Sequence, residues 1–211
     1  VTDVAAADST GTIAGFASAS GNFLPLVCTL NAARVLDSFS SLLGVDHSGL
    51  SQLALQANPG AGGMVLVPYF EGERTPNLPT AKASLHGLTL SNNSPANLAR
   101  AAVEGMLCGL ADGLEAILQA GVVCNRVILI GGAAASKAVQ VSASQIFGKP
   151  VFIPAPGEYV ANGAARQAAW ALLGALPQWP IDELATVSPD SHPEILDAYR
   201  AFQTQVARSL S

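Results

Sequence analysis

Charged residues are scarce in this sequence, at 12% of 211 residues, and basic residues are the rarer kind, which gives a formal net charge of −5. No long run of either sign occurs. Nucleic-acid surfaces and anionic-membrane patches depend on clustered Lys and Arg. The composition therefore argues against nucleic acid and against an anionic membrane surface as partners.

The sequence also lacks a hydrophobic run long enough to span a bilayer, because its longest apolar tract, at 168–176, is short and contains Gly174. The opening stretch VTDVAAADST has neither the basic start nor the apolar run of a secretory signal, and it has no initiator methionine. Half of the residues are apolar, which is ample for a core. We expect a cytoplasmic globular protein with no membrane partner, and we expect the chain to be a processed or excised piece.

Metal-binding patterns are missing as well. The cysteines Cys28, Cys108 and Cys124 are widely spaced, without a C-x-x-C pair or a nearby histidine. The histidines are His47, His86 and His192, and their spacing does not suit a metal. We interpret the cysteines as buried reduced thiols, the histidines as surface or loop residues, and the metal-ligand set as none.

Strand and helix patterns alternate along the sequence. We expect strands at 12–17, 64–67, 126–130 and 151–153, and helices at about 29–43, 95–120, 136–147, 160–173 and 193–209. Such alternation is typical of an α/β fold. It predicts a mainly parallel sheet flanked by helices.

The stretch VILIGGAAASK, residues 127–137, passes from a buried-strand pattern into two glycines and then a helix start. In open parallel sheets, ligands bind beyond the carboxyl ends of the strands. Gly131 and Gly132 would allow close backbone approach, and the next helix would offer free amides. The alternative is a tight strand-to-helix turn with no ligand. Neither G-x-G-x-x-G nor G-x-x-x-x-G-K-[ST] occurs, which disfavours a dehydrogenase or a P-loop enzyme.

Catalytic groups are scarcer than binding groups. Glu71, Glu73 and Arg74 share one loop, where a solvated ion pair is the ordinary interpretation. Glu104 and Asp112 fall within the long helix and are interpreted as polar-edge or buried hydrogen-bonding groups. No G-x-S-x-G elbow is present. We therefore predict no catalytic residue in this chain.

Four stretches, taken in order, resemble one family. They are PYFEGERTP at 68–76, GLTL followed by LARAAVEG within 87–105, IGGA at 130–133, and EYVANGAARQ at 158–167. Together they resemble the carboxyl-terminal domain of the FGGY carbohydrate kinases, and most closely the members that phosphorylate xylulose. The resemblance runs from about Thr12 to Gly174.

The resemblance implies an actin-like, ribonuclease-H-like ATPase domain whose nucleotide lies in a cleft between two domains. By motif position, Gly131 and Gly132 would let adenosine approach the backbone, with Ala133 beside the base and Ser136 able to hydrogen-bond it. Gly87 would contact the ribose or phosphate side. Ala133 stands where the family usually has a third glycine, and we expect its methyl group to narrow the base pocket.

Residues 1–211 would then be the nucleotide-binding half, with the amino-terminal sugar-binding domain and the catalytic base absent from this chain. Joined to that domain, it would transfer phosphate from ATP, with Mg²⁺, to D-xylulose; alone, it would be inactive. The alternatives are an FGGY kinase for ribulose, gluconate or glycerol, and a non-catalytic actin-like nucleotide-binding module. Whether the protein is a homodimer stays open.

Overall fold

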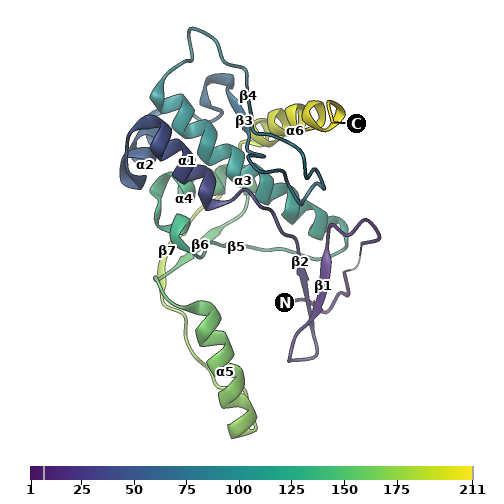
Figure 1. The fold of residues 1–211 in the computed structure, drawn as a ribbon. Helices are drawn as coiled ribbons and strands as arrows, with labels where there is room; N and C mark the ends of the chain where they lie inside the picture. Colours follow the sequence, from purple (N-terminus) through teal and green to yellow (C-terminus); the bar gives the residue numbers. More distant parts are fainter. Residues whose placement is uncertain (7, 211) are drawn as a thin grey trace.

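The computed structural model describes residues 1–6 and 8–210 and has an α/β architecture (Figure 1). The helices are α1 (Ala33–Leu43), α2 (His47–Gln56), α3 (Pro95–Gln119), α4 (Lys137–Phe147), α5 (Tyr159–Leu173) and α6 (Pro193–Arg208). The strands are β1 (Ala14–Ala17), β2 (Phe23–Leu26), β3 (Val65–Val67), β4 (Ser84–His86), β5 (Val127–Ile128), β6 (Val151–Pro154) and β7 (Glu183–Val187). Two short 3₁₀ turns, at Ala61–Gly63 and Gly132–Ala135, complete the order. The predicted α/β class is confirmed.

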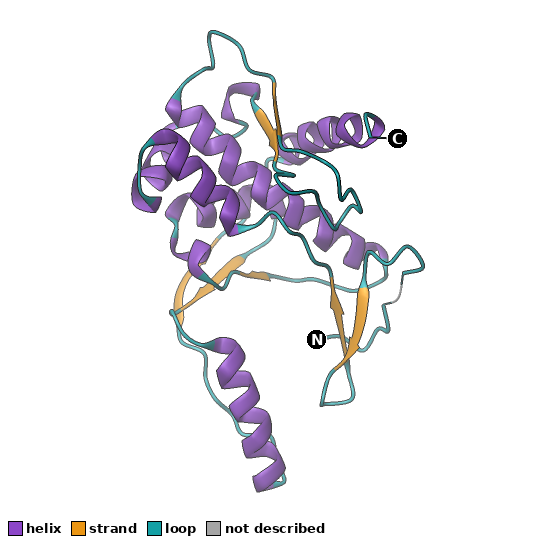
Figure 2. Ribbon diagram, in the orientation of Figure 1, coloured by secondary structure: helices purple, strands orange, loops and turns teal. Residues whose placement is uncertain are grey.

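The strands form three small sheets in the described part of the chain, as Figure 2 shows. β1 pairs with β2 and β3 with β4, both antiparallel, while the third sheet has the order β5-β6-β7. Of these pairings only β5 with β6 is parallel, so the expectation of a mainly parallel sheet is wrong for this chain. The reason is connectivity: β1 and β2 are joined by the tight turn at residues 18–22, and β7 returns beside β6 in the opposite direction.

Helix α3 forms the centre of the molecule. Its start follows the predicted signal, because the Ser94 hydroxyl accepts a hydrogen bond from the Asn97 amide and Pro95 occupies the first turn. α1, α2, α4, α6 and β3 all contact it. Gly105 makes the β3 contact feasible, since a Cβ there would lie 2.4 Å from the Leu66 carbonyl oxygen. The long helix that the apolar spacing predicted is therefore the core element.

A buried ion pair joins α3 to three other parts of the chain. Arg100 Nε lies 2.6 Å from Glu104 Oε1, and the two side chains are only 3% and 5% exposed. Glu104 also accepts the Gly60 amide at 2.9 Å, and the Arg100 guanidinium donates to Gln145 on α4. Gln145 Nε2 in turn donates to Asp190 at 2.9 Å, just before α6. Desolvation raises the pKa of the Glu104 carboxyl and Arg100 opposes that rise, so this residue is a buried hydrogen-bonding group.

Helix α6 is held to α3 by a second polar contact. Asp112 accepts hydrogen bonds from Arg200 Nε at 2.7 Å and from Gln203 Nε2 at 2.9 Å. Gln203 also donates to the Tyr69 hydroxyl at 2.8 Å. Asp112 is thus a structural anchor for α6.

Helix α5 differs from the others because none of its residues is buried. It projects from the body of the molecule, with the segment that leads to β7 running back along it (Figure 1). Its side chains Val160 and Leu172 are each 85% exposed. No helix in the described residues is both long and apolar enough to cross a membrane.

Replacing Arg100 with Met should leave the Glu104 carboxylate buried without its charge partner. Loss of one member of a buried pair typically costs about 3–5 kcal/mol, so we expect a loss of that order in unfolding free energy by urea denaturation. The double variant Arg100→Met/Glu104→Leu should recover part of the loss. Glu115→Ala, at a more exposed position of the same helix, is the control. A single variant within about 0.5 kcal/mol of wild type would contradict the role given to the pair.

Candidate nucleotide-binding site

The predicted strand–glycine–helix unit is present. β5 leads to Gly131, whose φ of 93° is in the region that favours glycine, and then to the 3₁₀ turn Gly132–Ala135. Ser136 caps α4, and its hydroxyl oxygen accepts the Val139 amide at 3.4 Å. The Ser136 hydroxyl hydrogen stays available to a further acceptor.

Gly131 and Gly132 face open space. A Cβ built on either residue would meet no atom within 4 Å. The backbone conformation accounts for glycine at position 131, but Gly132 lacks both a positive φ and a packing reason. A bare backbone over empty space is what close approach of a ligand requires.

One side of this turn opens into a pocket of about 350 Å³. Gly132, Ala133 and Ser136 line it on the turn side. The opposite walls come from α1, α2 and α3 and comprise Ala33, Leu36, Asp37, His47, Ser48, Leu50, Ser51 and Val103. Leu36, Leu50 and Val103 are buried and give the pocket an apolar floor, while the polar side chains lie on its rim. We call it the base pocket.

The walls of the base pocket are tied together by a direct contact. Ser51 on α2 accepts a hydrogen bond from the Ala138 amide in the first turn of α4 at 3.1 Å. α2 therefore holds the helix that follows Gly131 and Gly132 at a fixed distance.

The other side of the turn borders a second pocket of about 340 Å³. It lies at the carboxyl ends of β5 and β6, and Gly131, Gly132, Glu158 and Tyr159 contribute to its lining. Gly132 lines both pockets. A ligand with a flat apolar end and a polar tail could therefore cross the turn at Gly132.

Gly87 lines neither of these two pockets. It has a φ of 70°, and a Cβ there would lie 2.1 Å from the Gly63 carbonyl oxygen. Asn92 Nδ2 donates to the Gly87 oxygen at 2.8 Å and to the Gly62 oxygen at 3.1 Å. The structure thus brings Gly132, Ala133 and Ser136 together in the base pocket, with Gly131 beside them, and does not bring Gly87 there. Close packing explains this glycine, and its contact with a nucleotide stays a prediction.

The polar loop at 71–79 is organised by a buried carboxylate. Glu73 is only 2% exposed and accepts hydrogen bonds from Thr29 Oγ1 at 2.7 Å, the Leu30 amide at 2.8 Å and Asn31 Nδ2 at 2.9 Å. The interpretation of Glu73 as part of a solvated ion pair is wrong, because it anchors the loop to the segment before α1. Glu71 does form an exposed ion pair, with Arg34 of α1 at 2.9 Å.

The other titratable residues form no catalytic set in the described structure. His47 lies 3.2 Å from Asp37, and His192 lies 2.7 Å from Glu194. His86 stacks on Phe202, and desolvation lowers the pKa of its ring. The cysteines are free, with Cys108 buried and Cys28 and Cys124 half-buried, so only Cys108 fits the expectation of burial. No group of three or more His, Cys, Asp or Glu among the described residues could hold a metal ion.

The sequence patterns did not predict the α2 side of the base pocket or the place of Asp37 beside it. His47, Ser48 and Ser51 lie on a helix that the apolar spacing did not predict. The one local signal was Asp46, whose side chain caps α2 by accepting the Gly49 amide at 2.7 Å.

Gly87→Ala and Gly132→Ala should differ sharply in stability. At Gly87 the added methyl meets the Gly63 backbone at a positive φ, and we expect a loss of about 2 kcal/mol or more. At Gly132 we expect a change within about 0.5 kcal/mol. Thermal unfolding of both variants checks this. Equal destabilisation would show that Gly132 is also constrained by packing.

Comparison with known proteins shows what the chain as a whole resembles. Residues 3–172 match the FGGY family of carbohydrate kinases, C-terminal domain. The chain is 42% identical to xylulose kinase from Streptomyces coelicolor over 169 residues, covering 80% of this chain and 33% of that protein. The crystal structure of xylulose kinase from Bifidobacterium adolescentis matches with a TM-score of 0.87 and 45% identity, over 96% of this chain and 40% of that one. Glycerol kinase from Alkalilimnicola ehrlichii is 37% identical over 152 residues, 69% of this chain and 30% of that protein.

The chain therefore spans about a third of the length of the curated relatives it matches. The family match and the identity to xylulose kinase from Streptomyces coelicolor show that this chain belongs to the FGGY family of carbohydrate kinases. It corresponds to the C-terminal domain of that family.

Proposed function

We propose that this chain is the nucleotide-binding part of an enzyme that phosphorylates D-xylulose with MgATP. The observation that carries the nucleotide assignment is Gly132, which packing does not require and which borders a pocket on each side. The sugar and the catalytic base would be held by polypeptide outside residues 1–211. The chain itself would supply one wall of the cleft.

In this proposal the adenine ring enters the base pocket and the ribose and phosphates cross the backbone at Gly131 and Gly132. Leu36, Leu50 and Val103 would contact the ring and exclude water from it. Ala133 would lie beside the base, and the Ser136 hydroxyl would donate to a ring nitrogen. Phosphoryl transfer depends mostly on positioning and electrostatics, and fixing the nucleotide is this chain's part of it.

Magnesium would arrive with the nucleotide, where it neutralises developing charge on the phosphates. One or two carboxylates usually hold such an ion together with the phosphates, and the proposal assigns none of them to this chain.

The choice of xylulose rests on two supports, the stretch PYFEGERTP and the identity to named xylulose kinases. Glu73 in that stretch accepts hydrogen bonds from Thr29 and Leu30 of this chain. Its role is therefore to hold the loop rather than to contact a sugar. Glycerol kinase and gluconokinase are the specific alternatives, because relatives of these two kinds match 69% and 77% of this chain.

The amino-terminal part of the same enzyme is the partner we propose. Phe16, Leu26 and Ile128 are about half exposed and border a hollow of about 800 Å³ between the β1–β2 hairpin and β5. Among the described strands, β5 has no neighbour on the side away from β6. Exposed apolar area beside an open strand edge favours contact with further polypeptide.

The purified chain should bind ADP, and Gly132→Val should abolish that binding, because its side chain would occupy the space over the turn. Isothermal titration with MgADP measures both. Gly163→Val is the matched control, since Gly163 also has open space around its missing Cβ but lines neither pocket. Equal affinity in wild type and Gly132→Val would contradict the proposed site.

The chain alone should not phosphorylate D-xylulose, and co-expression with the amino-terminal part of its own enzyme should give activity. Coupled ADP-release assays with D-xylulose, L-ribulose, gluconate and glycerol would rank the acceptors. Turnover by the isolated chain would refute the two-part proposal. A preference for glycerol in the complex would contradict the choice of xylulose as the acceptor, but it would leave the two-part proposal in place.

A further inference from the structure

We propose that Asp37, which lies beside His47, makes the base pocket selective for nucleotides whose base carries an exocyclic amino group. This inference rests on the proposed function, because it assumes that a base enters the pocket. It goes further by assigning specificity to a pair of residues that lies outside the glycine motif.

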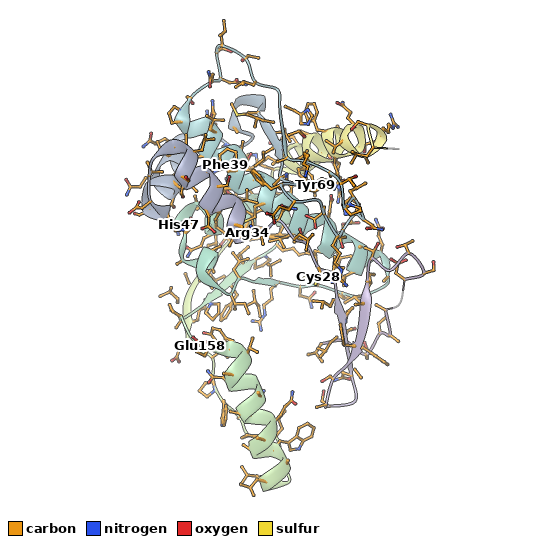
Figure 3. All side chains as sticks on the ribbon, viewed as in Figure 1. Cys28, Arg34, Phe39, His47, Tyr69 and Glu158 are labelled. Atoms are coloured by element: carbon orange, nitrogen blue, oxygen red, sulfur yellow. The ribbon has the colours of Figure 1, made fainter. Side chains whose placement is uncertain are left out.

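The pair lies at the rim of the pocket, opposite the glycine turn. Asp37 is on α1 and His47 begins α2, and both line the base pocket with Gly132 and Ser136. Figure 3 shows His47 beside the helix that carries Arg34 and Phe39. The His47 Nε2 atom lies 3.2 Å from Asp37 Oδ1.

The contact with His47 is to one carboxylate oxygen of Asp37. It is a charge contact when the imidazole is protonated. Among the described contacts, the Oδ2 atom of Asp37 takes part in no hydrogen bond. His47 thus lies beside Oδ1, while Oδ2 would accept from a donor in the pocket.

The apolar floor of the base pocket and the carboxylate on its rim together indicate which end of a nucleotide lies here. Arg34, the basic residue nearest in sequence on α1, pairs with Glu71 at 2.9 Å and also interacts electrostatically with Asp37. An Asp carboxylate repels phosphate, and the buried apolar floor of this pocket suits a base better than a phosphate. The acidic rim would thus receive the base, and the phosphates would lie on the glycine side.

Bases differ in what they present to Oδ2. Adenine presents an amino group, which can donate to the carboxylate. Hypoxanthine presents a carbonyl oxygen at the same position, and two acceptors facing each other repel. A site built to accept a hydrogen bond rejects an analogue that lacks the donor, and the effect is smaller where water reaches the group. Because the two side chains are 61% and 67% exposed, we expect about a tenfold preference rather than an absolute one.

The test compares ADP with IDP, which differ in this group, by isothermal titration into the chain. Wild type should bind ADP at least about tenfold more tightly than IDP. Asp37→Asn should bring the two dissociation constants within about threefold, because an amide can turn its oxygen to the amino group or its nitrogen to the carbonyl. Asp197→Asn, an exposed position on α6 away from the pocket, should keep the wild-type ratio.

Each outcome decides a separate point. Equal affinity of wild type for ADP and IDP, or an unchanged ratio in Asp37→Asn, overturns the selectivity while leaving the nucleotide site in place. Binding of neither nucleotide to wild type overturns the nucleotide site in this chain, and the selectivity with it. A ratio that collapses in Asp197→Asn as well would show that loss of acidic charge in general, and not the position of Asp37, sets the preference.

Discussion

The buried pair of Arg100 and Glu104 is the interaction on which the arrangement of the helices depends. Two opposite charges taken out of water are tolerated only when each is hydrogen-bonded further, and here those further bonds run to Gly60 and to Gln145 on α4. The partners thus belong to segments distant in sequence, so satisfying the pair fixes the helices relative to one another. Val103, next to Glu104 in the sequence, is thereby placed as part of the floor of the base pocket.

A second buried carboxylate, Glu73, does the same for α1. Its acceptor oxygens satisfy Thr29, Leu30 and Asn31, the residues that lead into a helix whose own cap residue, Ala32, offers no side-chain acceptor. The direction of α1 then decides where Asp37 lies. The loop at 71–79 is in this way a structural support for α1.

How far the sequence predicts this structure depends on the range of the interaction concerned. Ser94 and Pro95 and the apolar spacing that follows them are local, and they predicted α3 closely; the same holds for the passage from β5 into Gly131. α2 was missed because Ser48, Gly49 and Ser51 dilute its apolar pattern. The antiparallel return of β7 and the burial of Glu73 depend on partners far along the chain, which local patterns do not contain. The pairing of Asp37 with His47 needs the angle between two helices, so no spacing rule could have found it.

Two exposed surfaces of this chain differ in chemistry. One suits a small ligand, and the other suits a polypeptide partner. Around Gly132 the exposed surface is a bounded pocket with an apolar floor and a rim of hydroxyl, imidazole and carboxylate groups, which suits a small molecule that must be oriented. Around β5 and the β1–β2 hairpin it is open, mainly apolar and next to a strand edge. Polypeptide satisfies such an edge better than a small molecule does, because it supplies apolar side chains and backbone donors together. The two surfaces meet at the segment 127–132, so polypeptide that covers β5 would, under the function proposed above, lie beside the phosphates of the nucleotide.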